Sequence, residues 1–383
     1  MSILFLTTII PRQQKMGSEV ASQCFIDALK QKGHEVTVVG YMRQDDVFEP
    51  NSQEIVISKR YIETKKAKLY PIFWFIISLF KGIPYSAAKY YSSAYVKTIK
   101  SLVSSNQYDA IIIEHSQLGW LAPFIKNKDK LIFIAHNIEH EIYHYHFQKS
   151  SNLISKLIYK REARLIKRIE DKLVTGVRQV WALTEHDAKY FRGVKGAMGV
   201  KVFPLSPGSG KLPDKPINKK FDIGLIGSWL WKPNQEALHW FLQNVYPQLP
   251  NNLSIHVAGK GADWLIKEYP NIHYRGIVPN AQEFMAQAKV VAVPTLSGGG
   301  IQIKTLDAIA SGSLLVATPV AMRGIPQPPL TVKVAKTSEE FTKLLVKATA
   351  SSHHQETFHN AKNWYCLRRN KFFNEIDYAI KAI

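Results

Sequence analysis

A glycine-rich stretch in the last third of the chain has the composition of a phosphate-binding turn. An apolar run at 289–294 leads to three glycines at 298–300, a helix-like pattern follows, and a second apolar run closes the stretch at 314–319. This pattern predicts a strand, a glycine loop, a helix and a strand. The first N–H groups of a helix have no partner within it, and the helix dipole favours an anion there. A purely structural turn between two buried strands would explain the same pattern. Asp307 lies about two turns into the predicted helix, on the side that could reach a ribose hydroxyl.

Two histidines follow predicted buried strands at equivalent places. His115 closes the apolar run that begins at Tyr108, and His136 closes the one that begins at Leu131. Open parallel sheets bind their ligands at the carboxyl ends of the strands. A single histidine there is more often structural, but two at equivalent strand ends favour a function.

The segment His140-Glu141-Ile-Tyr-His144 has the spacing of a zinc-protease motif. On a helix it would place two imidazoles on one face beside a general base, and Glu162 could serve as a distant third ligand. A five-residue pattern arises easily by chance in a chain with 13 histidines. The surrounding strands and helices favour a nucleotide-binding fold, so a zinc protease is the lesser alternative.

Around these residues the chain repeats the order strand, helix, strand. The first unit begins with a strand at 2–8, a loop that contains Gly17, a helix at 20–32 and a strand at 35–40. The pattern restarts at 221 after a segment rich in proline and glycine. We therefore predict an α/β protein with two Rossmann-like doubly wound domains facing a central cleft. The predicted parts are an N-terminal domain at 1–205, a linker at 206–220, a second domain at 221–360, and a helical tail at 361–383 that packs back towards the first domain.

Composition narrows the classes of partner. The chain has 383 residues, 50 Lys and Arg against 30 Asp and Glu, and a net charge of +20, which implies an anionic partner. The cationic residues are dispersed and form no nucleic-acid-binding motif, so we expect no nucleic acid partner. Only two cysteines are present, which suits a reducing compartment. The first residues do not predict a signal peptide, and we expect a cytoplasmic protein.

Residues 65–100 have a composition that suits either the protein core or contact with a membrane surface. A mostly apolar run of twelve residues at 69–80 lies between lysines at 65–68 and Lys81. The run is too short to span a bilayer, which needs about 20 residues. It could be a core helix, or it could lie in the membrane interface with its aromatic residues down and its lysines at the flanks. We expect a core role for some of these side chains and leave peripheral contact with the inner membrane face open.

Taken in order, several short motifs resemble those of GT-B glycosyltransferases, specifically retaining family 4 (glycosyl transferases group 1) in its Gly-Gly-Gly…Ile-Lys branch. The resemblance covers most of the chain, and the ordered set is more specific than any single motif. The motifs are Gly17, Gly33-His-Glu-Val-Thr-Val38, His136-Asn-Ile-Glu139, Val257-Ala-Gly-Lys-Gly261, Arg275-Gly-Ile-Val-Pro279 and the stretch at 298–312.

The chain departs from the family pattern at several positions. The family has two glutamates eight positions apart; Gly299 stands at the first and Asp307 at the second. Ser228 replaces an arginine of the family, and the usual downstream lysine has only an approximate match in Lys232. The resemblance implies that Lys304 supplies the missing charge to the diphosphate. The donor sugar is therefore not defined by the motif.

The resemblance implies a site made by both domains, with an acceptor-binding domain at 1–205 and a nucleotide-sugar-binding domain at 221–360. Its catalytic residues would be His136, Lys232 and Lys304. Donor contacts would come from Gly17, Ser228, Gly259, Gly276, Gly298, Gly299, Gly300, Ile301 and Asp307. No Asp-x-Asp occurs in the chain, so we expect no metal and no cofactor beyond the nucleotide-sugar co-substrate.

The expected function is retaining, metal-independent transfer of a hexosyl or related sugar from a nucleotide-sugar donor. The acceptor would be anionic or lipid-linked, in surface glycan or polysaccharide synthesis.

Two alternatives from other classes remain open. One is a non-catalytic module that binds a sugar nucleotide or lipid, which the missing glutamate at Gly299 suggests, and the other is an epimerase with the same fold.

Overall fold

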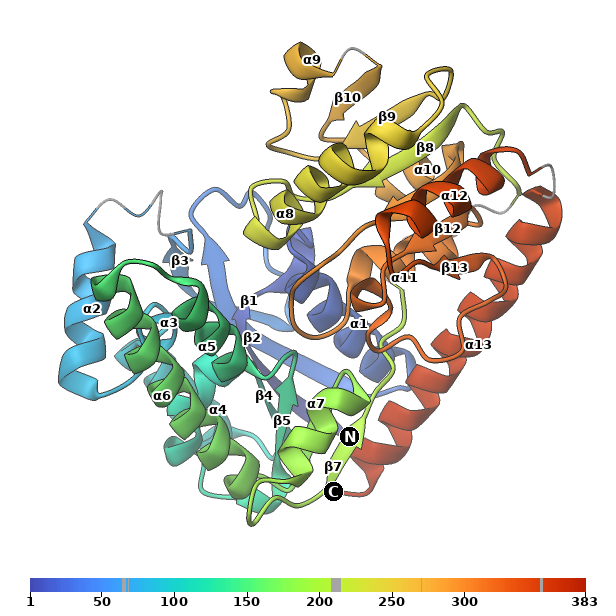
Figure 1. Ribbon diagram of the computed structural model, residues 1–383. Coiled ribbons are helices and arrows are strands. Elements are labelled where there is room, and N and C mark those ends of the chain that lie inside the picture. Colours follow the sequence, from blue (N-terminus) through green and yellow to red (C-terminus); the bar gives the residue numbers. More distant parts are fainter. Residues whose placement is uncertain (64–66, 68, 208–214, 270, 352–353) are drawn as a thin grey trace. The chain divides into compact units, whose positions relative to one another are not determined.

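The computed structural model describes the chain except residues 64–66, 68, 208–214, 270 and 352–353. It divides into two compact units, each a parallel sheet flanked by helices (Figure 1). Unit 1 comprises Met1–Phe203 and Phe372–Ile383, and unit 2 comprises Pro204–Lys371. The predicted fold class of two Rossmann-like doubly wound domains is confirmed. Part of the predicted linker, residues 208–214, lies outside the described residues.

The sheet of unit 1 has seven strands in the order β3-β2-β1-β4-β5-β6-β7, all paired in parallel. The order reverses direction beside β1, which is where such sheets bind ligands. The central strands are buried on both faces, as expected of strands covered by helices. The strands are β1 (Ser2–Ile9), β2 (Glu35–Arg43), β3 (Glu54–Arg60), β4 (Ala110–Glu114), β5 (Leu131–Ala135), β6 (Gln179–Ala182) and β7 (Val200–Val202).

Helices connect these strands. They form where apolar residues recur at helical spacing, so that one face of the helix is apolar. In the first helix, Ala21, Phe25 and Leu29 are buried at helical spacing. The helix Tyr70–Lys81, which covers most of the apolar run at 69–80, is different. Only its residues Trp74 and Ser78 are buried, so the core role that we expected applies to few of its side chains. The helices are α1 (Gly17–Gln31), α2 (Tyr70–Lys81), α3 (Tyr85–Ala88), α4 (Ser93–Ser105), α5 (Glu139–Lys149), α6 (Leu153–Gly176) and α7 (Glu185–Arg192).

Unit 2 has a six-stranded parallel sheet in the order β10-β9-β8-β11-β12-β13. β11 lies at its centre and leads directly into the glycine loop. The strands are β8 (Phe221–Ile226), β9 (Ile255–Ala258), β10 (Ile272–Gly276), β11 (Ala288–Val293), β12 (Leu314–Ala317) and β13 (Val332–Val334). The helices are α8 (Lys232–Trp240), α9 (Leu265–Glu268), α10 (Ala281–Gln287), α11 (Ile303–Ala310), α12 (Ser338–Thr349) and α13 (His354–Lys381).

The last helix, α13, contributes to both units. In unit 2, Arg368 Nε donates to Leu205 O at 2.7 Å, and its Nη2 donates to Gly324 O at 3.0 Å. In unit 1, Asp377 Oδ1 lies 3.0 Å from His34 Nε2. The final residues of the chain are thus part of the first unit. In the described part of the chain, no helix is both long and apolar enough to cross a membrane.

Candidate active site

The glycine loop joins β11 to α11 in the middle of unit 2. Gly298 and Gly300 have φ of 127° and 60°, in the left-handed region that favours glycine. Gln302 is the N-cap residue of α11, and its side chain makes no capping hydrogen bond. The first-turn N–H groups of α11 are therefore left without a side-chain cap, at the end of a helix that favours negative charge.

Asp307 lies closer to the start of α11 than the sequence suggests. Because the helix begins at Ile303, Asp307 is little more than one turn from its first residue, not two. Its side chain is half-buried, and its Oδ1 accepts a hydrogen bond from Gln282 Nε2 at 3.0 Å. The contact with α10 limits the directions in which the carboxylate can point.

Lys304 is held by a hydrogen bond to helix α8, which follows the neighbouring strand β8. Its Nζ donates to Asn234 Oδ1 at 2.7 Å, and Asn234 Nδ2 donates to Ser228 O at 3.0 Å. Burial lowers the pKa of Lys304 to about 8. The structure thus brings Lys304 and Ser228 together through one asparagine.

Two further side chains brace the glycine loop. Ser297 Oγ donates to Glu236 Oε2 at 3.0 Å, and Arg323 Nη1 donates to Gly298 O at 2.7 Å. Together with Asn234, these residues were not predicted from the sequence. Asn234 and Glu236 are 70 and 61 residues from their partners along the chain, and no local spacing indicates such a pair. For Arg323, the one sequence feature that could have indicated a role in the site is its position soon after strand β12.

Gly259 has a packing role of its own. A Cβ on Gly259 would lie 1.8 Å from Gly227 O, and Gly259 has φ of 109°. The ends of β8 and β9 can therefore approach this closely only with glycine at 259. Gly259 N donates to Gly276 O at 2.6 Å. A Cβ on Gly276 would meet no atom within 4 Å, and glycine there suits the φ of 61°. Contact of these glycines with a donor remains a prediction.

The other predicted residues of unit 2 surround the same strand ends. Lys232 is the first residue of α8 and is exposed, as is Ser228. Ile301 is buried, with 9% of its surface exposed. Its side chain therefore packs inward, and a contact with a ligand would have to use its backbone.

In unit 1, His136 forms part of a buried cluster at the ends of β4 and β5. His136 Nε2 lies 2.9 Å from Glu114 Oε1, and Glu114 is fully buried. Burial acts to raise the pKa of Glu114, but the hydrogen bond with His136 and the charges of the two imidazoles hold it below its usual value. The rings of His115 and His136 have centroids 4.0 Å apart. Burial, and then the charge of His136, lower the pKa of His115 to about 3.

Gly17 is the first residue of α1 and follows the loop after β1. It lies within the helix start rather than in the loop that the sequence predicts. The N-cap residue, Met16, makes no side-chain capping hydrogen bond. Nearby, Arg43 at the end of β2 forms an ion pair with Glu19 of α1, and both side chains are buried. That ion pair fixes the first turn of α1 to the end of β2.

The side chains that the zinc-protease alternative needs as ligands are paired with other groups. His140 Nδ1 is 2.8 Å from Glu170 Oε2, and His144 Nε2 is 3.0 Å from Gln148 Nε2. Glu162 accepts a hydrogen bond from Tyr85 N at 3.0 Å. Among the residues that the structure describes, the one group of three potential metal ligands is Glu114, His115 and His136.

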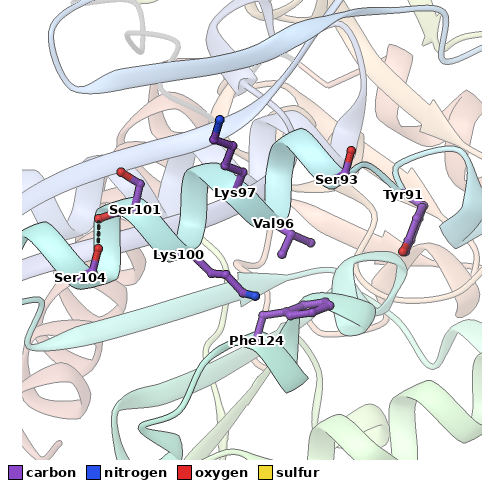
Figure 2. A pocket seen from close by; sticks show the side chains of 8 residues that line it. All are labelled: Tyr91, Ser93, Val96, Lys97, Lys100, Ser101, Ser104 and Phe124. Carbon is purple, nitrogen blue, oxygen red and sulfur yellow. Dashed lines mark hydrogen bonds between the residues drawn. The ribbon is translucent and has the colours of Figure 1, made fainter.

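Unit 1 also has an open groove of about 720 Å³ along α4 (Figure 2). Lys100 Nζ lies 5.3 Å from the centre of the Phe124 ring, and Lys97 lies one turn earlier on the helix. None of the predicted site residues is among the side chains that line the groove. These are Tyr91, Ser93, Val96, Lys97, Lys100, Ser101, Ser104 and Phe124.

Comparison with solved structures identifies proteins of the same fold. Sucrose-phosphate synthase from Thermosynechococcus elongatus has a TM-score of 0.69 at 13% identity, covering 100% of this chain and 97% of that one. WaaG, a glycosyltransferase involved in lipopolysaccharide biosynthesis, has a TM-score of 0.63 at 14% identity, covering 98% and 99%. HepE from Anabaena, in complex with UDP and glucose, has a TM-score of 0.61 at 15% identity, covering 100% and 98%. At these identities the likeness establishes the fold.

The sequence comparison finds a family model that matches most of the second unit. The family model for glycosyl transferases group 1 matches residues 220–349, which span β8 to the end of α12. A search of the curated proteins gave no match. The chain thus matches the family model of glycosyl transferases group 1 over residues 220–349 and has the fold of GT-B glycosyltransferases.

Proposed function

We propose that the protein is a retaining glycosyltransferase that binds the diphosphate of a nucleotide sugar at the glycine loop. The observation that carries the proposal is the start of α11. An uncapped helix N-terminus follows Gly298–Gly300, and the Lys304 ammonium lies in its first turn, held by Asn234. Backbone N–H groups and a nearby cation together favour a diphosphate over a neutral ligand.

In the proposed reaction the C1–O bond to the diphosphate breaks and a bond from C1 to the acceptor oxygen forms on the same face. The leaving phosphate oxygen takes the acceptor's proton, so a glycosidase-type carboxylate pair is not needed. The N–H groups of the glycine loop, Lys304 and Lys232 stabilise the leaving charge. His136 contacts the donor sugar. This chemistry uses no metal and no cofactor beyond the donor.

The proposed donor is a UDP-hexose or a related nucleotide sugar. HepE, which shares the fold, was solved with UDP and glucose. In this chain Asp307 would bind the ribose, and its half-buried position beside Gln282 suits an ordered hydrogen bond. Gly299 has no side chain to contact the sugar, so the sugar preference must come from other residues.

We propose further that helix α2 rests on a membrane surface and presents the enzyme to a lipid-linked or anionic acceptor. Large apolar side chains are exposed along α2, among them Phe73 at 59% and Phe80 at 86%. Figure 1 shows α2 at the periphery of unit 1. Arg161 Nη2 donates to Ser78 O at 3.0 Å and fixes α2 to α6. Exposed apolar surface of this kind marks an interaction site, and Lys81 at the helix end suits anionic headgroups.

The direct test is a screen of common sugar nucleotides by thermal shift, followed by a transfer assay with a bacterial lipid extract and the best donor. Specific binding raises the apparent melting temperature by mass action. We expect one class of donor to stabilise the protein and to yield an acceptor-dependent glycoside with the anomeric configuration of the donor. A donor that binds but is never transferred would indicate a binding module, and a product formed without acceptor would indicate an epimerase.

A further inference from the structure

Three side chains that can ligate a metal meet where two neighbouring strands of unit 1 end. Glu114 is the last residue of β4, His115 follows it, and His136 directly follows β5. The strands pair in parallel, with Glu114 opposite Ile134. Their carboxyl ends therefore lie at one edge of the sheet, where such folds bind ligands.

The spacing of the three groups fits a single ion. One ligand atom from each residue lies within 4.8 Å of the other two, and the separation from His136 Nε2 to Glu114 Oε1 is 2.9 Å. Two ligands of a tetrahedral zinc ion, each about 2.1 Å from it, are roughly 3.4 Å apart. The observed range brackets that value. His115 is also held at φ 68° and ψ 138°, a costly backbone conformation that persists only where the surroundings impose it.

The charge of the cluster also points to a cation. Glu114 is fully buried, and among the residues that the structure describes it forms one ion pair, with His136. Its second oxygen, Oε2, is buried without a hydrogen-bond partner among the described residues. The hydroxyl of Ser22 also lies within reach of Glu114 and acts to lower the pKa of that carboxyl, although its single proton is donated to Ser18 O at 2.8 Å. A buried carboxylate oxygen without a donor is costly, and coordination of a metal removes that cost.

We propose that Glu114, His115 and His136 form a zinc-binding site with one open coordination position. Two imidazoles and one carboxylate are a donor set that zinc binds with water as the fourth ligand, whereas magnesium and calcium prefer oxygen ligands alone. Coordination through His136 Nε2, the nitrogen nearest Glu114, leaves Nδ1 for a donor sugar. The site lies in unit 1 and is independent of the proposed diphosphate contacts, which all belong to unit 2.

The test is calorimetric titration of zinc alone into the untagged, chelator-treated full chain. We expect one equivalent of zinc to bind, and Co²⁺ to give the visible absorption of a four-coordinate site. His115→Ala and Glu114→Gln should each weaken zinc binding at least about tenfold, since each removes a ligand. The matched control is His144→Ala, which removes an exposed histidine of the same unit and should leave binding unchanged.

Two results would overturn the site. One is no stoichiometric zinc binding by the folded wild-type chain, checked by circular dichroism. The other is equal loss of binding in His115→Ala and His144→Ala, which would indicate dispersed surface histidines. If Glu114→Gln fails to fold, His115→Ala still decides, because His115 is half-buried whereas Glu114 is fully buried. Neither result bears on sugar transfer, because the titration contains no donor or acceptor.

Discussion

At the scale of single residues, Lys304 combines burial with a role that needs positive charge. Burial lowers its pKa to about 8, and the ammonium is the form that would bind a diphosphate. Its charge is present below that pH and is lost above it. We therefore expect the affinity for UDP, measured by calorimetry, to fall by up to about tenfold per pH unit above pH 8.

The matched control for this pH dependence is Lys304→Met, which removes the titrating group and keeps an unbranched side chain. This variant should bind UDP weakly, and its affinity should depend less on pH. Any pH dependence that remains would come from the nucleotide or from other groups of the protein. Identical profiles in the wild-type protein and the variant would show that Lys304 does not contact the diphosphate.

Asp307 gives a second prediction at this scale. Asp307→Asn keeps the size of the side chain and its partner Gln282 but removes the charge that would accept hydrogen bonds from ribose hydroxyls. Hydrogen bonds to charged groups contribute about 1.5–3 kcal/mol, so affinity for UDP should fall roughly tenfold or more. Calorimetry with UDP measures this directly. Unaltered affinity would rule out the ribose contact.

The sequence indicated the glycine loop and the strand-end histidines because their signals are local. It did not indicate Asn234 or Arg323, since their roles depend on contacts with Lys304 and Gly298, 70 and 25 residues away. Such pairs are set by how α8 and the segment after β12 pack against the loop. The zinc-protease motif failed for the same reason, because its histidines were paired by side chains outside the motif.

At the scale of elements, buried strands and amphipathic helices were predicted within a few residues because their apolar periodicity is strong. The edge strand β3 was missed, since its residues are mostly half-buried or exposed and carry no long apolar run. The start of α11 was also misplaced. Two non-helical residues, Ile301 and Gln302, separate the glycines from the helix, so the loop is longer than the pattern suggested.

Helix α2 gives a prediction at this scale. Replacing Ile72 and Phe73 together with aspartate should greatly reduce co-sedimentation with vesicles that contain anionic lipid, because both exposed side chains would leave the bilayer interface. Both residues are exposed, so the melting temperature should change little.

The control is Leu330→Asp, which changes an equally apolar side chain that is 84% exposed in unit 2. It should co-sediment like the wild-type chain. Equal vesicle binding by all three proteins would contradict the role of α2, and equal loss in all three would point to non-specific adhesion.

At the scale of the whole molecule, the fold class followed from the order of strands and helices, because parallel sheets with helical connections have few alternatives. The strand order in each sheet was beyond the sequence, since it depends on which strands pair across long crossovers. The tail at 361–383 was expected to pack back towards the first domain, but the point at which α13 passes from unit 2 to unit 1 was not predicted, because its contacts with Leu205 and His34 join segments more than 160 residues apart.

The central claim is that Lys304 and the glycine loop hold the leaving diphosphate during sugar transfer. The most direct measurement is the transfer rate, at saturating donor, of the wild-type protein, Lys304→Ala and the control Lys343→Ala, an exposed lysine of α12 in the same unit. Loss of one electrostatic stabiliser in an enzyme site costs about 100- to 1000-fold in rate. The account predicts a loss of at least about tenfold for Lys304→Ala with the fold intact, and no loss for Lys343→Ala. An unchanged rate for Lys304→Ala would contradict it.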